Sequence, residues 1–518
     1  MITLNQLITT KEKFYVSTPL FSNENKTAKE RIPQSQFLRE LDPNGHKILS
    51  PIYYPDIYKK VPDDEKAPDG SFHWVVKHVE RVSIAIQQMI LYKRLTHLCG
   101  DKMSFYLMSN NPEENQKNSY TSYKQKWLVY NMDTGFYDFA KSVFSTGDGA
   151  ICLFRDENGL TDYKTFSIAN GDILHPVRDF NGKLRIFGRE FSDVVNNIET
   201  LSSVRYLEVW DDTNYYLFCS DPTREVKDIT YPNWDDNYKS IPSNNDTSWF
   251  ILQNKRHGFK HIPVEYLKNE NGACWSPVQH LSDALEKALS EFFENNKSYA
   301  FRIMYIQGGF EVQADFVGNS KEPTAILLED SDAKVGFVEG AEASGAFKEQ
   351  LQQTLNFIKI GGFIVFPPES ISGDTSGTAI KILYAPAIEK AKDDIHFFNR
   401  SIRNICDLFK ESISLEKDGS PSDYNNIIIK PFLNPYIPQN DQENINNMAV
   451  AIGAGYFSKE SAREHDNNCA PDEEERVQNE KQEDALLERS SIIGNGEPNI
   501  PVNQNTENTQ RQIIAENG

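Results

Sequence analysis

Apolar residues recur at intervals of three or four along several stretches of the chain, the spacing that places them on one face of a helix. One stretch runs from Trp74 to about Leu98 and is stopped by Gly100. Another begins near Thr378 and contains Pro386, which is expected to kink the helix because proline cannot donate the helical hydrogen bond. The pattern predicts a helix at each of these places.

Two further helices are predicted between them, joined by a short β-rich segment. The first begins at Ser276, a good N-cap that Gln279 would complete as a capping box. It is expected to run as far as the glycine pair 308–309. The second covers about 344–360 and is cut by glycines 361–362. Two helices that leave a body and return to it predict an exposed tip.

Between the first helix and this central pair the apolar period changes to two, which is typical of strands. The alternation runs from Trp127 to about Phe218, and a further apolar strand is expected at 427–429. Turn signals separate the strands, at Gly159, Gly171 and Gly182. The polar segment 220–248 predicts a surface insertion. The fold class is therefore α+β, built on an antiparallel sheet.

The two ends of the chain carry weaker patterns. The first 70 residues are rich in Pro, Asn and charge, and they predict an extended arm with short elements. Three short helices are predicted near the other end, over about 440–453, 458–465 and 472–489. Residues 490–518 are rich in Asn and Gln and predict a mobile tail.

The chain has 518 residues, with 54 Lys and Arg against 75 Asp and Glu, for a net charge of −21. This balance argues against a protein that grips nucleic acid by neutralising phosphates, but it suits one that lets DNA slide past. No apolar run approaches the roughly 18 residues that span a bilayer, and no signal peptide is visible, so we expect no membrane partner. The six cysteines form no Cys-x-x-Cys pair and predict reduced thiols.

No motif predicts catalysis. The loop at 372–378 opens a helix and could hold an anion, but a P-loop needs its lysine directly after the second glycine, and Lys381 comes one turn too late. A nucleotide-dependent hydrolase using this loop is kept as the alternative function. The acidic run 472–475 lacks the spacing of a calcium loop, and the ten histidines are scattered. We therefore expect no catalytic residue, no cofactor and no metal.

Four segments, taken in chain order, carry a resemblance to a known family. They are His261–Tyr266, Leu281–Leu285, Thr375–Lys381, and Ala451–Ser461 followed by Asp472–Arg476. In this order they resemble segments of the portal (connector) proteins of tailed double-stranded DNA bacteriophages, and the likeness covers roughly residues 74–490. The Asn-, Ile- and Lys-rich composition suggests a phage of an AT-rich host, such as a crAss-like phage.

The resemblance implies the portal fold, assembled as a ring and divided into named parts. These are an N-terminal arm (1–73), an α+β wing (74–275, with the insertion 220–248), a stem helix (276–307), a small β-rich clip (308–342), a second stem helix (343–360), a tunnel loop (361–377), a long kinked helix with a wing strand (378–437), an α-helical crown (438–489) and a flexible tail (490–518).

The resemblance also implies a structural protein without enzymatic activity, forming a ring of about twelve copies at one capsid vertex. The ring would be a DNA channel for genome packaging, retention and ejection. Its partners would be other copies of the chain, double-stranded DNA, the terminase packaging motor, a head–tail adaptor or tail proteins, and the major capsid protein. The protein would be located in the virion, and in the host cytoplasm during assembly.

Three groups of residues are predicted to carry these roles. The stem stripes are expected to need neighbouring copies to cover them, at Leu281, Leu285, Leu289, Phe292, Leu351 and Leu355. The tunnel loop is predicted to be a glycine-hinged, uncharged collar around DNA, made of Gly361, Gly362, Phe363, Ile364, Val365, Phe366, Pro367, Pro368, Gly373 and Gly377. A buried strand is the alternative for 363–366. Arg302 and Lys359 are candidate DNA-facing cations, with ordinary surface cations as the equal alternative.

Overall fold

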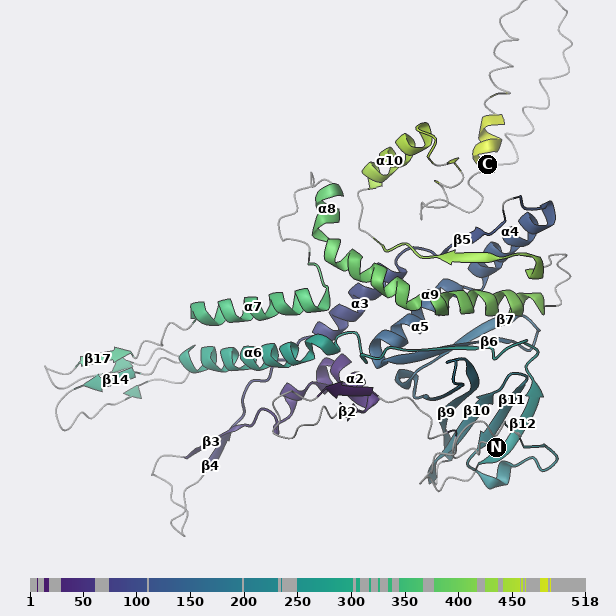
Figure 1. The fold of residues 1–518 in the computed structure, drawn as a ribbon. Helices are drawn as coiled ribbons and strands as arrows, with labels where there is room; N and C mark the ends of the chain where they lie inside the picture. Colours follow the sequence, from purple (N-terminus) through teal and green to yellow (C-terminus); the bar gives the residue numbers. More distant parts are fainter. Residues whose placement is uncertain are drawn as a thin grey trace, which may run out of the picture. The chain divides into compact units, whose positions relative to one another are not determined.

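The computed structural model divides the chain into two units, residues 1–438 and 439–518. The residues that the structure describes are 7, 14–17, 29–60, 74–109, 111–197, 200–231, 234, 249–300, 304–307, 316–317, 325–326, 334–337, 344–366, 377–416, 424–436, 441–456, 458–459, 462, 476–482 and 485. The first unit holds the sheets and the long helices, and the second contains α10 (Asp441–Gly453). Figure 1 shows the course of the chain.

The main core of the first unit lies among four helices. They are α3 (Ile86–Cys99), α4 (Glu114–Val129), α5 (Met132–Thr146) and α9 (Ala385–Ser414). The ring centroids of Trp127 and Phe409 are 5.2 Å apart, and those of Phe139 and Phe398 are 6.1 Å apart, both edge to face. Such ring pairs add to the gain from burial, so α9 is held firmly along its C-terminal half.

Two antiparallel sheets form the next layers (Figure 1). One has the strand order β13–β6–β7 and the other β12–β11–β10–β9–β8. The strands are β6 (Asp148–Arg155), β7 (Thr161–Phe166), β8 (Ile173–Arg178), β9 (Leu184–Asn197), β10 (Thr200–Trp210), β11 (Asn214–Cys219), β12 (Phe250–Arg256) and β13 (Val264–Lys268). Alternation along β6 places Ile151 and Leu153 in the helical core, and Ala150 and Cys152 against the five-stranded sheet. The predicted α+β class is confirmed.

The central helix pair was predicted, although its ends lie elsewhere. A 3-10 turn, η5 (Ser276–Val278), leads into α6 (Gln279–Ala300), and α7 (Ser344–Gly362) returns beside it (Figure 1). Between them, β14 (Met304–Gln307) pairs with β17 (Lys334–Phe337), and β15 (Phe316–Val317) pairs with β16 (Ala325–Ile326). The rest of this predicted β-rich segment lies outside the described residues.

Part of the predicted N-terminal arm belongs to the core. The elements here are β1 (Phe14–Ser17), β2 (Lys29–Ile32), α2 (Gln34–Leu41), η1 (Pro43–Gly45), η2 (Lys47–Leu49), and the paired strands β3 (Ile57–Lys60) and β4 (Trp74–Lys77). Phe37 of α2 is buried in the main core, and Ile48 of η2 is also buried. Residues 34–50 are therefore packed against the body and do not extend away from it.

The remaining described elements are short. They are η3 (Ile168–Asn170), η4 (Pro222–Arg224), η6 (Tyr424–Asn426), α8 (Gly377–Leu383), and β5 (Ser104–Leu107) paired with β18 (Ile429–Phe432). The kink predicted at Pro386 is found at Tyr384, the single residue between α8 and α9, and the proline lies in the first turn of α9. Of the predicted insertion 220–248, residues 220–231 and Trp234 are described, and Trp234 is buried against the five-stranded sheet.

Two helix predictions are wrong at an end. Residues 74–77 form β4, and the helix that follows begins only at Ile86. Residues 304–307 form β14 and do not continue the helix that begins near Gln279. In both places β-branched and aromatic residues favour a strand once a partner strand is present. The partner strands, β3 and β17, are separate segments of the chain, so the spacing within each stretch could not identify them.

Other boundaries are corrected in the same way. The alternation predicted from Trp127 begins only at Asp148, because α4 and α5 occupy the residues before it. Ser276 does not cap a helix: it starts η5, and its hydroxyl is buried with no hydrogen-bond partner among the described residues. The strand expected at 427–429 begins at Ile429, where pairing with β5 starts. Glycine turns are confirmed, with φ of 81° at Gly159, 84° at Gly171 and 77° at Gly182.

Candidate functional site

The residues predicted to pack the central helices meet in one contact between α6 and α7. Leu285 on α6 is 4% exposed and lies in the main core together with Ile358 of α7. Four others pack against that core while remaining partly exposed: Leu281, Leu289, Leu351 and Leu355. Farther along the pair, the ring centroids of Phe292 and Phe347 are 5.9 Å apart. The apolar stripes of the two helices therefore pack partly against each other within one chain, and their covering by neighbouring copies stays a prediction.

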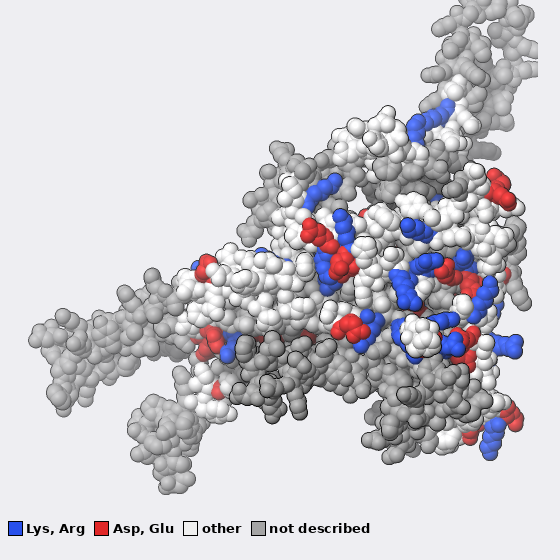
Figure 2. Space-filling model, in the orientation of Figure 1, with Lys and Arg blue, Asp and Glu red and all other residues white. Residues whose placement is uncertain are grey.

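Several apolar side chains of the α6–α7 pair remain exposed. Phe293 is 50% exposed, Phe357 is 58% exposed and Ile360 is 71% exposed. Residues 350–358 of α7 include no charged side chain. Figure 2 shows that the visible face of this pair carries few Lys, Arg, Asp or Glu, whereas charges of both signs cover the region around α9. This surface is suited to contact with another protein surface.

A second face of α6 is polar and buried, which the sequence analysis missed. Ser282, Glu286, Ser290 and Glu294 recur every four residues and all are buried. Glu286 accepts hydrogen bonds at one carboxylate oxygen, from the Ile84 backbone N–H at 2.8 Å and from the His46 ring at 2.5 Å. Ser290 accepts a hydrogen bond from the Val82 backbone N–H at 2.9 Å. These bonds fix two N-terminal segments in register on α6.

The His46–Glu286 pair is electrostatically coupled. Burial opposes protonation of the His46 ring, but the hydrogen bond and the charge of Glu286 outweigh it and raise the pKa of His46 above its usual value. The other ring nitrogen lies 2.8 Å from the Glu40 backbone carbonyl. A protonated ring can donate to both groups at once, so the pair links α2, η2 and α6 most strongly when His46 is charged.

The glycines predicted as hinges have another role. Gly361 and Gly362 are the last two residues of α7 and have helical backbone. A Cβ on Gly361 would lie 2.6 Å from Cγ1 of Val278, and one on Gly362 would lie 3.2 Å from Cδ1 of Ile90. The absence of side chains therefore lets the end of α7 contact η5 and α3 closely.

The described half of the predicted tunnel loop is neither a strand nor wholly exposed. Phe363 follows α7 with a left-handed φ of 54°, a strained conformation for a bulky residue. The Ile364 N–H then donates to the Lys359 carbonyl at 2.9 Å, closing the helix end, and the Ile364 side chain is buried. Val365 follows, and Phe366 packs against the main core. The rest of this segment, including Pro367, Pro368 and Gly373, lies outside the described residues, and Gly377 begins α8.

Of the two candidate DNA-facing cations, the structure describes only Lys359. Arg302 lies outside the described residues. The Lys359 Nζ lies 4.9 Å from the centroid of the Phe366 ring, within the range of a cation–π contact. That contact holds Lys359 against the residues that follow α7, so the ammonium group stabilises this junction whether or not it also faces DNA.

The described residues include no group of His, Cys, Asp and Glu able to hold a metal ion. Of the loop 372–378, the structure describes only the two residues that begin α8. Five cysteines are free thiols, while Cys469 lies outside the described residues. Among the helices of the described ranges, none has the length and apolar character needed to span a bilayer.

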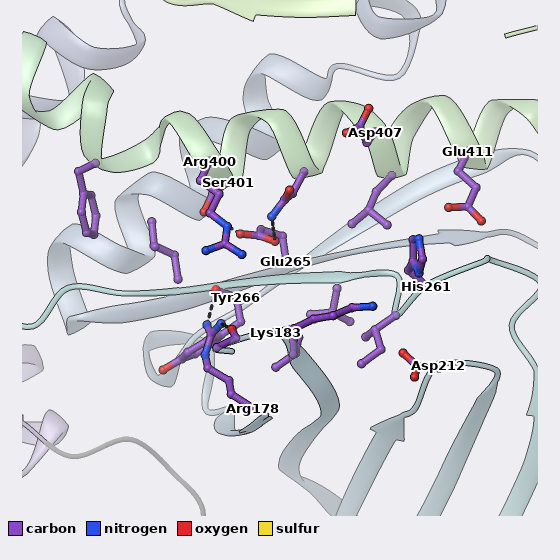
Figure 3. A pocket seen from close by; sticks show the side chains of 18 residues that line it. Arg178, Lys183, Asp212, His261, Glu265, Tyr266, Arg400, Ser401, Asp407 and Glu411 are labelled. Atoms are coloured by element: carbon purple, nitrogen blue, oxygen red, sulfur yellow. Dashed lines mark hydrogen bonds between the residues drawn. The ribbon is translucent and has the colours of Figure 1, made fainter. Parts of the chain in front are cut away.

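A cavity of about 490 Å³ lies where α9, β13 and the β8–β9 turn meet (Figure 3). Glu265 of β13 accepts hydrogen bonds from the Ser401 hydroxyl at 2.7 Å and the Asn404 amide at 3.0 Å. Burial raises the pKa of Glu265, although these two bonds oppose the shift. Arg178 donates to the carbonyls of Gly182 and Tyr266. Polar residues spaced three or four apart on α9, opposite its apolar stripe, were the sequence signal for this cavity.

The comparisons with known proteins agree with this architecture. A family model described as phage portal protein, SPP1 Gp6-like, matches residues 81–486. The chain therefore belongs to the SPP1 Gp6-like family of phage portal proteins. A search of curated proteins finds no match.

Family membership establishes the general role of the protein. It is a structural protein of the bacteriophage virion, associated with the portal vertex of the capsid and with genome packaging. Its partners are, in general terms, capsid and packaging components. The suggestion of a crAss-like phage stays a prediction.

Proposed function

We propose that the protein assembles into a closed ring of about twelve copies, through which double-stranded DNA is packaged, retained and ejected. Membership of the portal family is the observation that carries this proposal. The exposed apolar residues Phe293, Phe357 and Ile360 support it, because a neighbouring copy would remove them from water.

The parts of the ring are proposed from the element boundaries. The stem would be α6 and α7, and the clip would lie between them. The wing would comprise 74–275 and 378–437, and the crown 438–489. The tunnel loop would begin after Gly362 and run to Gly377. The terminase motor would bind first and the head–tail adaptor later, both at the clip, while the major capsid protein would surround the wing. Assembly would take place in the host cytoplasm.

Charge favours passage of DNA over retention by ionic contacts. The chain carries 75 acidic against 54 basic residues. A lumen of acidic or neutral surface repels phosphates and does not release counterions, so it does not trap the duplex. The uncharged residues 350–358 would add a non-adhesive surface if α7 faces the channel.

Electron microscopy of the purified chain, combined with mass photometry, tests the proposal. The expected result is a ring with a central hole and a mass of about twelve chains. Monomers only, across a wide range of concentration and salt, would overturn it. An ATP-hydrolysis assay on the same sample addresses the alternative function. Turnover that is abolished by a Lys381→Ala change would favour the hydrolase over a purely structural ring.

A further inference from the structure

Residues 47–83 form a loop that carries the paired strands β3 and β4, and both of its ends meet on α6 (Figure 1). Directly before the loop, Nδ1 of His46 lies 2.5 Å from Oε1 of Glu286. Directly after it, the Ile84 N–H donates to the same oxygen at 2.8 Å. One carboxylate oxygen therefore holds both ends of the loop.

The other contacts described between these ends and α6 each hold one end. The Lys47 ammonium lies 3.0 Å from the Asp283 carboxylate, but its side chain is half exposed, and an exposed pair of this kind contributes little. The Val82 N–H donates to the Ser290 hydroxyl at 2.9 Å. Ile48 adds one buried apolar side chain. Glu286 is thus the group whose contacts depend on both ends being in place.

The loop is also closed by contacts of its own, which do not use α6. Arg81 donates to the Tyr54 carbonyl at 2.8 Å and pairs with Asp56 at 2.7 Å. His78 lies 2.9 Å from the other carboxylate oxygen of Asp56. These contacts join the stretch before β3 to the stretch after β4. On either side of the loop, α2 and α3 bury side chains in the main core. The loop can therefore leave α6 as one body while the core stays folded.

Both oxygens that face the His46 ring need a hydrogen between them and the ring. Nδ1 faces the Glu286 carboxylate, and Nε2 lies 2.8 Å from the Glu40 backbone carbonyl, which can only accept. A neutral ring has one N–H, so beside an ionised Glu286 it would leave one nitrogen lone pair against an oxygen. The side chains of His46 and Glu286 are 3% and 2% exposed, so water does not replace the missing bond. Loss of the proton therefore costs one buried hydrogen bond.

Charged groups of three elements surround the His46 ring. Asp283 and Glu286 lie on α6, Glu40 on α2 and Lys47 on η2, and Lys47 is paired with Asp283. The chain directly before α3 contains no charged side chain. Burial disfavours the charged ring, but the bond to Glu286 and the acidic charges outweigh burial and raise the pKa of His46 above 6.5.

We propose that residues 47–83 form a pH-sensitive arm, clamped to α6 while the His46–Glu286 pair holds its proton and released from α6 as one body when that proton is lost. This inference concerns a single chain and goes beyond the proposed ring. The described part of the arm exposes Ile57, Tyr58 and Val76. Release therefore changes where the molecule presents an apolar surface.

Hydrogen–deuterium exchange of the full chain between pH 5.5 and 9 tests the arm. Protection factors, corrected for the intrinsic rate at each pH, are followed for peptides covering 46–58 and 76–84, with α9 as reference. Between pH 6.5 and the folded pKa of His46, the released state has lost the proton that the clamped state keeps. Protection at both ends should therefore fall about ten-fold per pH unit in this window and level off above it. Protection of α9 should not change.

Three variants identify the titrating group. His46→Gln has no ring to titrate, so the fall with pH should disappear. Glu286→Gln keeps an acceptor for the Ile84 N–H but removes the charge, so both ends should already be weakly protected at pH 6. This second variant keeps the test open should His46→Gln fail to fold. The control is His78→Gln, which changes another histidine of the arm, 82% exposed and in contact with Asp56. The control should keep the fall.

Several results would overturn the arm. One is protection of both ends that does not depend on pH. Another is a fall that α9 shares, because this would be unfolding of the body. A fall at one end only would contradict release as one body. A fall that disappears in His78→Gln but persists in His46→Gln would assign the proton to the contacts of Asp56. None of these results bears on the proposed ring, since assembly is not the quantity measured.

Discussion

The two faces of α6 are held by different kinds of interaction. Toward α7, Leu285 and its neighbours bury apolar surface, which stabilises the contact in proportion to area but tolerates small shifts. Toward the N-terminal segments, Glu286 and Ser290 make hydrogen bonds to particular backbone N–H groups. Hydrogen bonds of this kind require one register, because a shift of one residue leaves buried polar groups without partners.

One helix can therefore be anchored by apolar packing on one face and aligned with the body by hydrogen bonds on another. The apolar face packs α6 against α7, and the polar face fixes the position of α6 against the N-terminal segments. Two of the four predictions that follow alter one face of α6 each, and the other two concern the end of α7 that packs beside it. Each is measured as the free energy of unfolding by urea titration.

The largest effect is expected on the apolar face. Leu285→Ala should lower the free energy of unfolding by about 2–5 kcal/mol, because Leu285 is 4% exposed and its removal leaves a cavity. The control is Phe293→Ala on the same helix, where the ring is 50% exposed. Equal losses in the two variants would contradict the packing described for this face.

The close approach of α7 to η5 gives the second prediction. Gly361→Ala should cost about 1–3 kcal/mol, because the new Cβ would lie 2.6 Å from Cγ1 of Val278. The control is Gly345→Ala in the first turn of the same helix, where nothing lies within 4 Å of the new atom. That change should be neutral or slightly stabilising. Adding Val278→Ala to Gly361→Ala should recover part of the loss, and no recovery would place the strain elsewhere.

The polar face gives the third prediction. Glu286→Gln should cost about 1–2 kcal/mol near pH 6, since His46 loses its charged partner. The folded-state pKa of His46 is raised, so the stabilisation is complete below the unfolded value and is lost as pH rises through the folded value. The difference between wild type and variant should therefore shrink as pH increases. A difference that grew with pH would show that His46 is not the group responsible.

The smallest effect concerns the residue that ends α7. Phe363 has a φ of 54°, which costs about 1 kcal/mol or slightly more for a residue with a Cβ. Phe363→Gly should thus be more stable than Phe363→Ala by about that amount, because both lose the ring but only glycine loses the strain. Identical stabilities would mean that this backbone conformation is relaxed in solution.

Local pattern predicted those parts of the fold in which neighbours in sequence decide the outcome. The glycine turns need a left-handed backbone, and the stripe on α9 follows from one helical period, so both were predictable. Residues 74–77 and 304–307 were not, because each becomes a strand only through a distant partner. The helical period of α5 was present in Phe136, Phe139 and Val143 but was missed beside the strands that follow.

The candidate site was predictable to a similar degree. Leucines on α6 and α7 are apolar at helical spacing, so their packing role was visible, and part of that packing is between the two helices of one chain. The sequence analysis singled out Gly361 as a hinge. In the structure this position has no room for a side chain because of Val278, which lies 83 positions earlier in the sequence. The polar face of α6 was hidden, because serine and glutamate at four-residue spacing are ordinary on a solvated helix.

The pairing of β14 with β17 has a consequence for the evolution of this region. Met304 lies opposite Phe337, so the chain that leaves α6 and the chain that enters α7 are already joined at the root of the segment between them. Once its ends are fixed, lengthening such a segment costs only about 0.6 kcal/mol of closure entropy for each doubling. The segment can therefore be replaced or enlarged almost independently of the body. Relatives that must fit different neighbours are expected to diverge here in length and sequence while keeping the helix pair that carries it.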